Sequence, residues 1–289
     1  MASSLHVITD SAALFTESAL ARSPHLTIVP FRVEINGKRY AEGTEIDTDA
    51  YWHYVRDNWP PPTLHAPSVQ DYQAALEKLR HRPVTVLVLP SSNHLSASFA
   101  NAKQACQTMM GSMQLRLFDT HNFAIGLGLM IEHVLRASQR GEHPDNVLRS
   151  LHGMINRIYT LFYLDTMRPL EALGQVTRTQ SVLGDMLEIQ PLLTLEDGRI
   201  LPIEKVYNRA AAFEKIAEFT AEFLEIANLV ILYGNPEQGD DLRALRDRLA
   251  LDLPGRHVPA FTYGPSLASL LGTRAIGITV HEIDSDNED

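Results

Sequence analysis

Residues 84–102 of the chain read VTVLVLPSSNHLSASFANA, and this stretch decides how the rest of the sequence folds. Residues 84–89 form an unbroken apolar run rich in β-branched residues, which is typical of a strand buried on both faces. Pro90 ends the run, polar residues follow, and small residues then recur at helical spacing. We therefore predict a buried strand, a hydroxyl-rich loop and a helix, in that order.

The loop after this strand holds a run of polar residues, Ser91-Ser92-Asn93-His94. Open α/β folds bind ligands at the carboxyl edge of the sheet, where backbone N–H groups and helix dipoles favour anions. Ser92 or Asn93 could instead cap the following helix. Capping accounts for one such residue but not for the whole run, so we expect the loop to hold an anionic head group.

The chain has 289 residues, enough for two ordinary domains or one large one, and its 45% hydrophobic and 21% charged residues are typical of a globular protein. A net charge of −10 opposes nucleic-acid binding. The longest nearly apolar stretch, residues 123–131, is too short to cross a bilayer, so no stable membrane insertion is expected. No export signal is apparent, which predicts a cytoplasmic protein. The single cysteine, Cys106, is expected to be a buried structural thiol.

Polar residues also end two other predicted strands of the first half. Residues 5–8 run into Thr9-Asp10-Ser11, and residues 115–118 run into Asp119-Thr120. The carboxyl ends of parallel strands meet at one edge of a sheet, so these residues and the central loop should lie together.

Local signals predict the other elements of the first half. Asn36-Gly37 is a strong hairpin signal, and Ser68 with Asp71 resembles a capping box. In chain order, we predict a strand over residues 28–35, a second hairpin strand over 38–40 and a helix over 49–59. Asp47 or Thr48 should cap this helix, and Pro60-Pro61-Pro62 should end it. A polar loop over 63–68 and helices over 69–79, over 123–140 and from Pro144 follow.

The second half follows a different pattern. It begins with a predicted strand over residues 158–164, a polar segment without clear periodicity over 165–179 and a hairpin that turns at Glu196-Asp197-Gly198. A helix from Asn208 through Glu225, a strand over 228–233 and a helix over 242–249 are predicted next. The last predicted elements are a strand leading into Thr262 and a strand over 275–280. The whole predicts two α/β domains, residues 1–157 and 158–289, the first with a mainly parallel sheet flanked by helices.

Common enzyme signatures are weak in this sequence. A serine-type esterase or acyl hydrolase could use Ser92 with His94 or His121 and Asp119, but no G-x-S-x-G elbow occurs. His65 and these two histidines lack metal-ligand spacing, so no metal is expected. Gly126-x-Gly128 lies in an apolar helical stretch and indicates close helix packing rather than a dinucleotide loop. We expect no cofactor.

Taken together, the motifs resemble the DegV family, the bacterial two-domain fatty-acid-binding proteins. The matching segments, almost end to end, are Ile8-Thr9-Asp10-Ser11, Val29-Pro30-Phe31, Tyr40-Ala41-Glu42-Gly43 with Ile46, Ala66-Pro67-Ser68, Ser92-Asn93-His94-Leu95-Ser96-Ala97-Ser98, Asp119-Thr120 with Gly126 and Gly128, and Lys205-Val206. The resemblance implies a long-chain fatty acid in an apolar tunnel, bound at the domain junction with its carboxylate held by hydroxyls. It also implies a non-enzymatic carrier, similar to the lipid-presenting subunit of a fatty acid kinase, whose separate kinase partner transfers the phosphoryl group.

The family pattern carries over residue by residue, with several changes. The carboxylate-holding serine falls on Asn93, with Ser92 beside it. The threonine of the family's TSxPS loop falls on Thr63 or on Leu64, and the histidine before its late G-P-G falls on Thr262. The family's charged K-G-G-R loop is replaced by Ala172-Leu173-Gly174-Gln175. The residues expected to hold or border the head group are Thr63, His65, Ser92, Asn93, Ser96, Thr262 and Tyr263. A further alternative is that the scaffold binds another amphiphile.

Overall fold

The computed structural model describes residues 4–57, 62–172, 174, 176–235 and 237–283. The chain forms two compact units, and each is drawn from separate stretches of sequence. Unit 1 comprises residues 1–47, 62–156 and 197–199, and unit 2 comprises residues 48–61, 157–196 and 200–289. The domain boundary placed after residue 157 is a single cut of the chain, and it stays a prediction.

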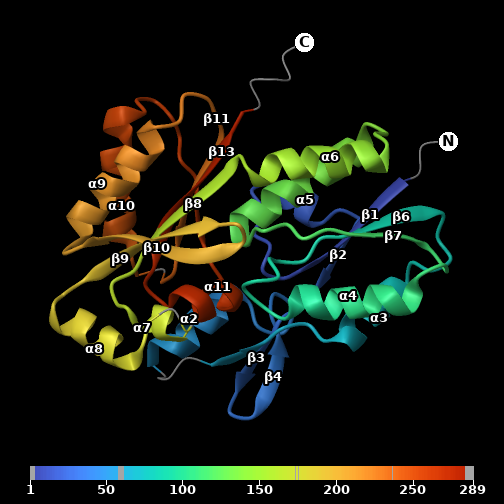
Figure 1. The fold of residues 1–289 in the computed structure, drawn as a ribbon, viewed down its shortest axis with the longest axis horizontal. Coiled ribbons are helices and arrows are strands. Elements are labelled where there is room, and N and C mark those ends of the chain that lie inside the picture. Colours follow the sequence, from blue (N-terminus) through green and yellow to red (C-terminus); the bar gives the residue numbers. More distant parts are fainter. Residues whose placement is uncertain (1–3, 58–61, 173, 175, 236, 284–289) are drawn as a thin grey trace. The chain divides into compact units, whose positions relative to one another are not determined.

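The main sheet of unit 1 has four parallel strands. In spatial order they are β2 (Leu26–Val29), β1 (Ser4–Asp10), β6 (Val84–Val88) and β7 (Gln114–Leu117). The predicted parallel sheet is therefore confirmed, with the apolar run of residues 84–89 next to its centre (Figure 1). Because all four strands point the same way, the polar residues that follow β1, β6 and β7 meet at one edge.

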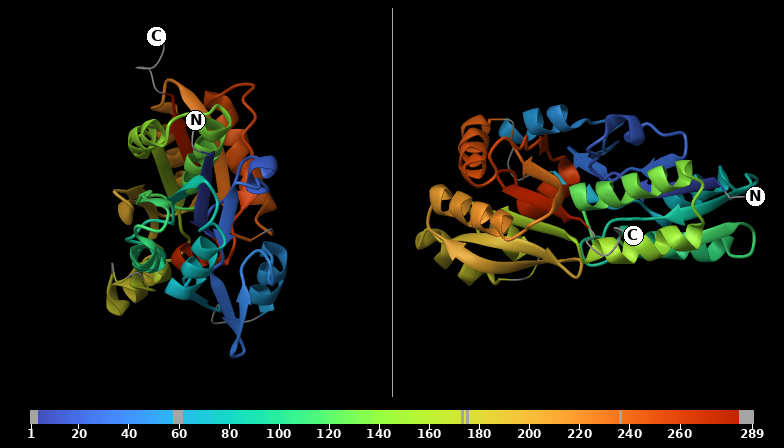
Figure 2. Two further views of the ribbon diagram at one scale, coloured as in Figure 1. Left: turned by 90° about the vertical axis from the view of Figure 1, so that its right-hand side faces the viewer. Right: turned by 90° about the horizontal axis from the view of Figure 1, so that it is seen from above.

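Helices cover both faces of this sheet. On one side lie α3 (Val69–Glu77) and α4 (Ser98–Met109), and on the other lie α5 (Ala124–Gln139) and α6 (Pro144–Ile155) (Figure 1). The last two run side by side, as the green and yellow-green helices of Figure 2 show. Cys106 lies in the core between α3, α4 and the sheet, and burial raises the pKa of its thiol to about 11, as expected for a structural cysteine.

A small antiparallel sheet in unit 1 corrects two predictions. Its strands, in spatial order, are β4 (Lys38–Ala41), β3 (Arg32–Ile35) and β5 (Thr63–His65). The single strand predicted over residues 28–35 is wrong, because the chain leaves the main sheet at Pro30, which has no N–H to donate, and re-enters a different sheet. The polar loop predicted from residue 63 is likewise wrong at its start, because β5 pairs with β3.

The turn between β3 and β4 forms as predicted. Asn36 and Gly37 both have positive φ angles, 52° and 75°, as a type I′ turn requires. The Ser68–Asp71 capping box of α3 is also confirmed, since each residue's side chain accepts a hydrogen bond from the other's backbone N–H. Arg32 makes two 2.6 Å hydrogen bonds to Asp71 and so ties β3 to this helix start.

Unit 2 is built on a six-stranded mixed sheet. In spatial order its strands are β10 (Arg199–Val206), β9 (Gln190–Glu196), β8 (Ile158–Tyr163), β13 (Ile276–Glu282), β11 (Ile226–Tyr233) and β12 (Ala260–Thr262). The β9–β8, β8–β13 and β13–β11 pairs are antiparallel, and β11 and β12 are parallel. The predicted hairpin between β9 and β10 is confirmed, with positive φ at Asp197 and Gly198.

Helices α9 (Arg209–Ala221) and α10 (Gly239–Asp252) pack together against this sheet and complete its core (Figure 1). Asn208 caps α9 as predicted, through a 2.8 Å bond from the Ala211 N–H. The helix ends at Ala221 rather than at residue 225, because β11 begins at Ile226 and the chain must turn before it.

The polar segment predicted over residues 165–179 in fact contains helix. It holds α7 (Arg168–Ala172) and the start of α8 (Arg178–Met186), whose first turn is closed by a Thr177–Gln180 capping box. The remaining helices are α1 (Ser18–Ala21), α2 (Thr48–Asp57) and α11 (Pro265–Leu271).

Several predicted features lie outside the described residues. They are Trp59, Pro60 and Pro61 at the end of the helix predicted over residues 49–59, and Leu173 and Gln175 of the altered loop. In the part of the chain that is described, no helix is long and apolar enough to cross a membrane.

The loop after β1 crosses α5 in close contact. A Cβ atom at Gly128 would overlap the backbone carbonyl of Leu14, and the Leu14 N–H donates 3.1 Å to the Ala124 carbonyl. Next in this loop, the N–H of Thr16 and the N–H of Glu17 both donate to the fully buried Glu132 carboxylate. The close packing predicted for Gly126-x-Gly128 is thus confirmed at Gly128, where the partner is the backbone of a loop, and it stays a prediction for Gly126.

We expect Gly128→Ala to lower the free energy of unfolding by about 2 kcal/mol or more, because the added methyl group meets fixed backbone rather than a movable side chain. Chemical denaturation of the full chain measures this. Gly239→Ala is the matched control, since no described residue beyond its own helix turn lies within 4 Å of the position that its Cβ would take and its φ is not in the left-handed region. Equal stability of the two variants would contradict the close contact.

A buried histidine in β1 makes the fold sensitive to acid. His6 is only 4% exposed and shares a 2.8 Å hydrogen bond with Thr27. Burial, together with the charges of His25 and Arg82, lowers the pKa of His6 from 6.5 to about 4. The unfolded chain therefore takes up this proton at a higher pH than the folded chain does.

The contribution of His6 to stability should be complete above pH 6.5 and decline as the pH falls toward 4, by up to about 3 kcal/mol. Denaturation at several pH values, compared with His6→Gln, isolates this effect because the other titrating groups are common to both proteins. A constant stability difference between the two proteins across this range would refute the assignment.

Candidate functional site

Asp10 is the centre of the polar edge of the parallel sheet. It ends β1, is completely buried, and accepts hydrogen bonds from four groups. Its Oδ2 atom accepts from the Ser91 N–H at 2.9 Å, the Ser91 hydroxyl at 2.8 Å and the Ser98 hydroxyl at 2.5 Å. Its Oδ1 atom accepts from the Ala12 N–H at 3.2 Å. Burial raises the pKa of Asp10, and these hydrogen bonds oppose that shift.

Two hydroxyl chains extend from this carboxyl group. In one, the Ser91 hydroxyl lies 3.3 Å from the hydroxyl of Ser96, which is half-buried. In the other, the Ser98 hydroxyl lies 2.6 Å from the hydroxyl of Tyr72, which α3 holds in the core. Burial, and next the charge of Asp10, raise the pKa of Tyr72 well above its usual value. The edge is thus a connected network rather than a set of separate polar residues.

Neighbouring residues fix the ends of the strands around this network. The Thr9 hydroxyl donates 2.7 Å to the Leu89 carbonyl, and the Thr120 hydroxyl donates 3.0 Å to the Pro90 carbonyl. The Ser11 hydroxyl donates 2.6 Å to Glu42 and accepts from the Phe31 N–H at 2.9 Å. The three polar strand ends predicted to lie together are therefore brought together, as expected from parallel strands.

The loop after β6 does not cap α4. That helix begins at Ser98 with Ala97 at its N-cap position and has no side-chain cap, so capping by Ser92 or Asn93 is wrong. Ser92 is fully buried, and its hydroxyl donates 2.7 Å to the Gly198 carbonyl. Asn93 is exposed, and among the described residues only Asp119 contacts it, accepting from its backbone N–H at 3.4 Å. Asn93 and Ser96 are thus the two predicted residues of this loop with side chains accessible to a ligand.

The loop after β7 contains buried oxygen atoms without hydrogen-bond partners in the described part of the chain. They are Oδ2 of Asp119 and Oδ1 of Asn122, and Asn122 is only 3% exposed. The His121 ring lies 3.7 Å from that Asp119 oxygen. Asn122 also donates to the Thr120 carbonyl at 3.1 Å, which fixes its amide in place.

The geometry does not assemble a hydrolase from these side chains. The Ser92 hydroxyl contacts the Gly198 carbonyl and the His94 backbone N–H, and neither histidine ring is among its partners. A nucleophilic serine needs a base within hydrogen-bond reach of its hydroxyl. Within the residues described, no group of His, Cys, Asp and Glu side chains is arranged to hold a metal ion.

Two predicted residues lie on β5 of unit 1. Thr63 is exposed at the edge of the small sheet. His65 is half-buried, and its ring lies 2.9 Å from Glu34, which also accepts a 2.9 Å hydrogen bond from Arg39. The hydrogen bond from Arg39 lowers the pKa of Glu34 most, and the hydrogen bond from His65 lowers it further. A ligand role for Thr63 and His65 stays a prediction.

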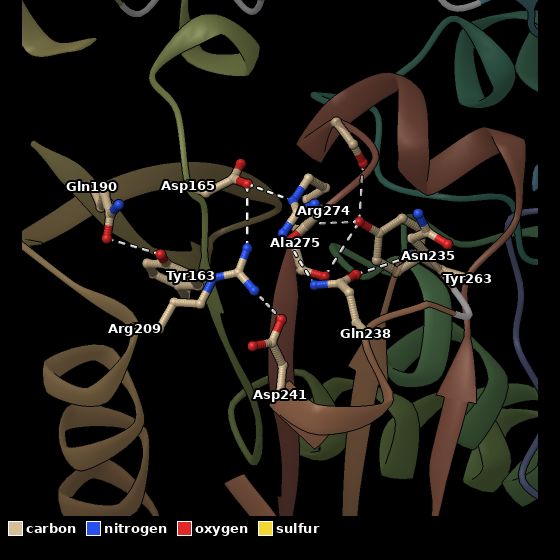
Figure 3. A network of polar contacts seen from close by, with 11 residues as sticks. Tyr163, Asp165, Gln190, Arg209, Asn235, Gln238, Asp241, Tyr263, Arg274 and Ala275 are labelled. Carbon is tan, nitrogen blue, oxygen red and sulfur yellow. Dashed lines mark hydrogen bonds and ion pairs between the residues drawn. The ribbon is translucent and has the colours of Figure 1, made fainter. Parts of the chain in front are cut away.

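The other two predicted residues lie in unit 2. Thr262 is half-buried at the end of β12, and its role also stays a prediction. Tyr263 is fully buried, and its hydroxyl accepts from the Ala275 N–H at 3.1 Å and donates to the Gly272 carbonyl at 2.9 Å (Figure 3). The Tyr263 carbonyl accepts from the Trp52 indole at 2.9 Å. These contacts give Tyr263 a structural position, with its hydroxyl occupied by backbone groups.

Unit 2 also contains a cavity of about 900 Å³, bordered by α7, α11 and the segment from α8 to β9. The residues lining it are Asp165, Thr166, Arg168, Pro169, Asp185, Glu188, Ile189, Gln190, Ala268, Ser269, Leu271, Gly272, Thr273 and Arg274. Asp165 accepts from Arg274 at 2.8 Å and pairs with Arg209 at 3.4 Å, so it holds two arginines at one side (Figure 3).

Residues that the sequence reasoning missed are Ser98 and Tyr72, together with the central role of Asp10. Their contacts join segments that are 26 and 88 positions apart in the chain. No local pattern in the sequence marks such partners. Thr-Asp-Ser at the end of a buried strand was a usable signal for Asp10 itself.

We expect Tyr263→Phe to lower the free energy of unfolding by about 1–3 kcal/mol, because the Ala275 N–H and the Gly272 carbonyl would lose a buried partner. Denaturation of the full chain measures this, with Tyr207→Phe as the control at a 59% exposed tyrosine. An unchanged stability combined with loss of ligand binding would instead favour the ligand-holding role.

The sequence of this chain is similar to known proteins over nearly its whole length. A family model described as "Uncharacterised protein, DegV family" matches residues 4–282. A DegV domain-containing protein of Staphylococcus aureus is 25% identical over 279 residues, which are 94% of this chain and 95% of that protein. A DegV domain-containing protein of Listeria innocua is 24% identical over 278 residues, covering 94% and 96% of the two chains.

Solved structures give the same result for the fold. A fatty-acid-binding DegV family protein of Streptococcus agalactiae superposes with a TM-score of 0.87 at 21% identity, over 98% of this chain and 100% of that one. A DegV family protein of Thermus thermophilus, described by its fatty acid binding, has a TM-score of 0.82 at 25% identity, over 96% and 99%. Since the family model spans almost all of the sequence, this chain belongs to the DegV family.

Proposed function

We propose that this protein binds a long-chain fatty acid and carries it without chemically changing it. The observation that supports this most directly is the fatty acid binding described for the Thermus thermophilus relative, which matches 96% of this chain at 25% identity. The Streptococcus agalactiae protein, described in the same way, shares the fold.

The polar edge of unit 1 supports a carboxylate head group. The Asn93 amide is exposed, and the Ser96 hydroxyl is half-buried at the outer end of the network around Asp10. Both side chains are neutral and carry a group that can donate a hydrogen bond. A hydrogen bond to a charged carboxylate is worth about 1.5–3 kcal/mol, enough to fix which end of the ligand lies here.

The cavity of unit 2 supports the binding of a large ligand. Its volume of about 900 Å³ is in the range of small-molecule sites. Pro169, Ile189, Ala268 and Leu271 form the apolar part of its lining. Each buried CH₂ group contributes about 0.8 kcal/mol, so a long chain could supply roughly 10 kcal/mol before ordering costs.

A carrier acts by presenting its ligand to another protein. The sequence contains no G-x-x-x-x-G-K-[ST] phosphate-binding loop. We therefore propose that any phosphoryl transfer to the bound fatty acid comes from a separate kinase. The Ser92 hydroxyl donates to the Gly198 carbonyl, so no observation favours the esterase alternative.

We expect mass spectrometry of an organic-solvent extract of the freshly purified full chain to show a fatty acid at close to one per protein. The protein after removal of its lipid should bind added oleate. A lipid-free extract together with no binding of oleate would contradict the proposed function, and a different amphiphile in the extract would redirect it.

We expect the double variant Asn93→Ala, Ser96→Ala to bind oleate at least about tenfold more weakly, because two donors to the charged head group are removed. Isothermal titration calorimetry measures this, with Ser112→Ala as the control at an exposed serine of the same unit. Unchanged affinity in the double variant would show that the head group is held elsewhere.

A further inference from the structure

The buried carboxyl group of Asp10 has only neutral partners. Two hydroxyls and two backbone N–H groups donate to it. Among the described residues, no lysine, arginine or histidine contacts it. A second negative charge brought close to such a group in a buried setting strongly disfavours the ionised pair.

The direction of each hydrogen bond in the two hydroxyl chains follows from proton counting. A serine hydroxyl has one proton. The Ser91 proton is given to Asp10, so the Ser96 hydroxyl must be the donor in the 3.3 Å contact between these serines. By the same reasoning Tyr72 donates to Ser98, whose own proton goes to Asp10. Ionised Asp10 thus turns every hydroxyl proton of both chains inward.

This direction is unfavourable for an anionic ligand. With its proton turned inward, Ser96 presents only lone pairs outward, and one of these already accepts from the Ser98 N–H at 3.2 Å. Ser92 cannot compensate, because its proton is given to the Gly198 carbonyl. The loop can donate a hydroxyl proton to a carboxylate only if the chain from Asp10 to Ser96 is reversed.

We propose that an anionic head group binds this edge together with one proton from solvent, which Asp10 takes up; this rests on the fatty-acid function proposed above. Protonated Asp10 donates to the Ser91 hydroxyl, the Ser91 hydroxyl donates to Ser96, and Ser96 donates to the head group. The net change is one proton gained per ligand bound. Burial, which raises the pKa of Asp10, makes this uptake easier.

The other titratable groups around this edge are not placed to take up the proton and pass a hydrogen bond to the head group. On α3, Tyr72 is reached only through Ser98, and Asp71 is paired with Arg32. On α4, Cys106 is buried in the apolar core.

On the loops, His94 is exposed, and Asp119 faces His121 at 3.7 Å. On the strand side, Glu42 is joined to the edge through Ser11. Of the titratable groups in the described part of the chain, only Asp10 is linked to Ser96 through a hydroxyl, that of Ser91.

The test measures proton uptake directly. The probe is hexadecanesulfonate, whose head group stays ionised from pH 5 to 8, alongside oleate. Calorimetry of the full chain in buffers with different ionisation heats gives the protons taken up per ligand. We expect uptake approaching one proton, and affinity for the sulfonate that weakens by up to tenfold for each unit of rising pH.

Variants test whether the proton taken up on ligand binding goes to Asp10. Asp10→Asn should bind the sulfonate with no proton uptake. Ser96→Ala, which keeps the hydrogen bonds of Ser91 and Ser98 to Asp10, should lose uptake even if Asp10→Asn fails to fold. Ser112→Ala should behave as the unaltered chain does. Binding of the sulfonate without uptake, or uptake that persists in Asp10→Asn or in Ser96→Ala, would overturn this inference and leave the fatty-acid function standing. Failure of both probes to bind at any pH would contradict the fatty-acid function itself, and with it this inference.

Discussion

The hydrogen bonds from Ser91 to Asp10 are the constraint on which the polar edge of unit 1 depends. They join the ends of two neighbouring parallel strands, β1 and β6, through one buried oxygen atom. Leaving a carboxyl group in the core is costly unless all its hydrogen bonds are made. Because Ser98 completes this set, the start of α4 is held at the same point. One buried side chain thus fixes two strands, a loop and a helix start.

The sequence predicts the strongly patterned parts of this fold well. The apolar run at residues 84–89, the Asn36-Gly37 turn and the Ser68–Asp71 capping box each act over a few residues, and all three appear in the structure. The break at Pro30 is harder, because the residues on both sides have strand character and only the tertiary pairing shows that they belong to different sheets. The Thr177–Gln180 capping box was a readable signal for α8 that apolar periodicity alone did not reveal.

The position of the candidate site could be predicted from the sequence, but the hydrogen-bond partners of its residues could not. Polar strand ends locate the edge, since parallel strands place them together. They do not say which hydroxyl is available to a ligand. Ser92 and Asn93 are adjacent in sequence, yet one is fully buried and bonded to Gly198 and the other is exposed. That difference depends on a residue 106 positions away in the chain, which no local pattern contains.

The anchoring of the loop after β1 has a consequence for its dynamics. Residues Thr16 and Glu17 lie outside any helix or strand, where backbone N–H groups usually exchange with solvent quickly. Here both N–H groups donate to the fully buried carboxylate of Glu132 on α5. Their exchange therefore requires the loop to separate from the helix, so these two amides report on the opening of the helix layer rather than on the mobility of a surface loop.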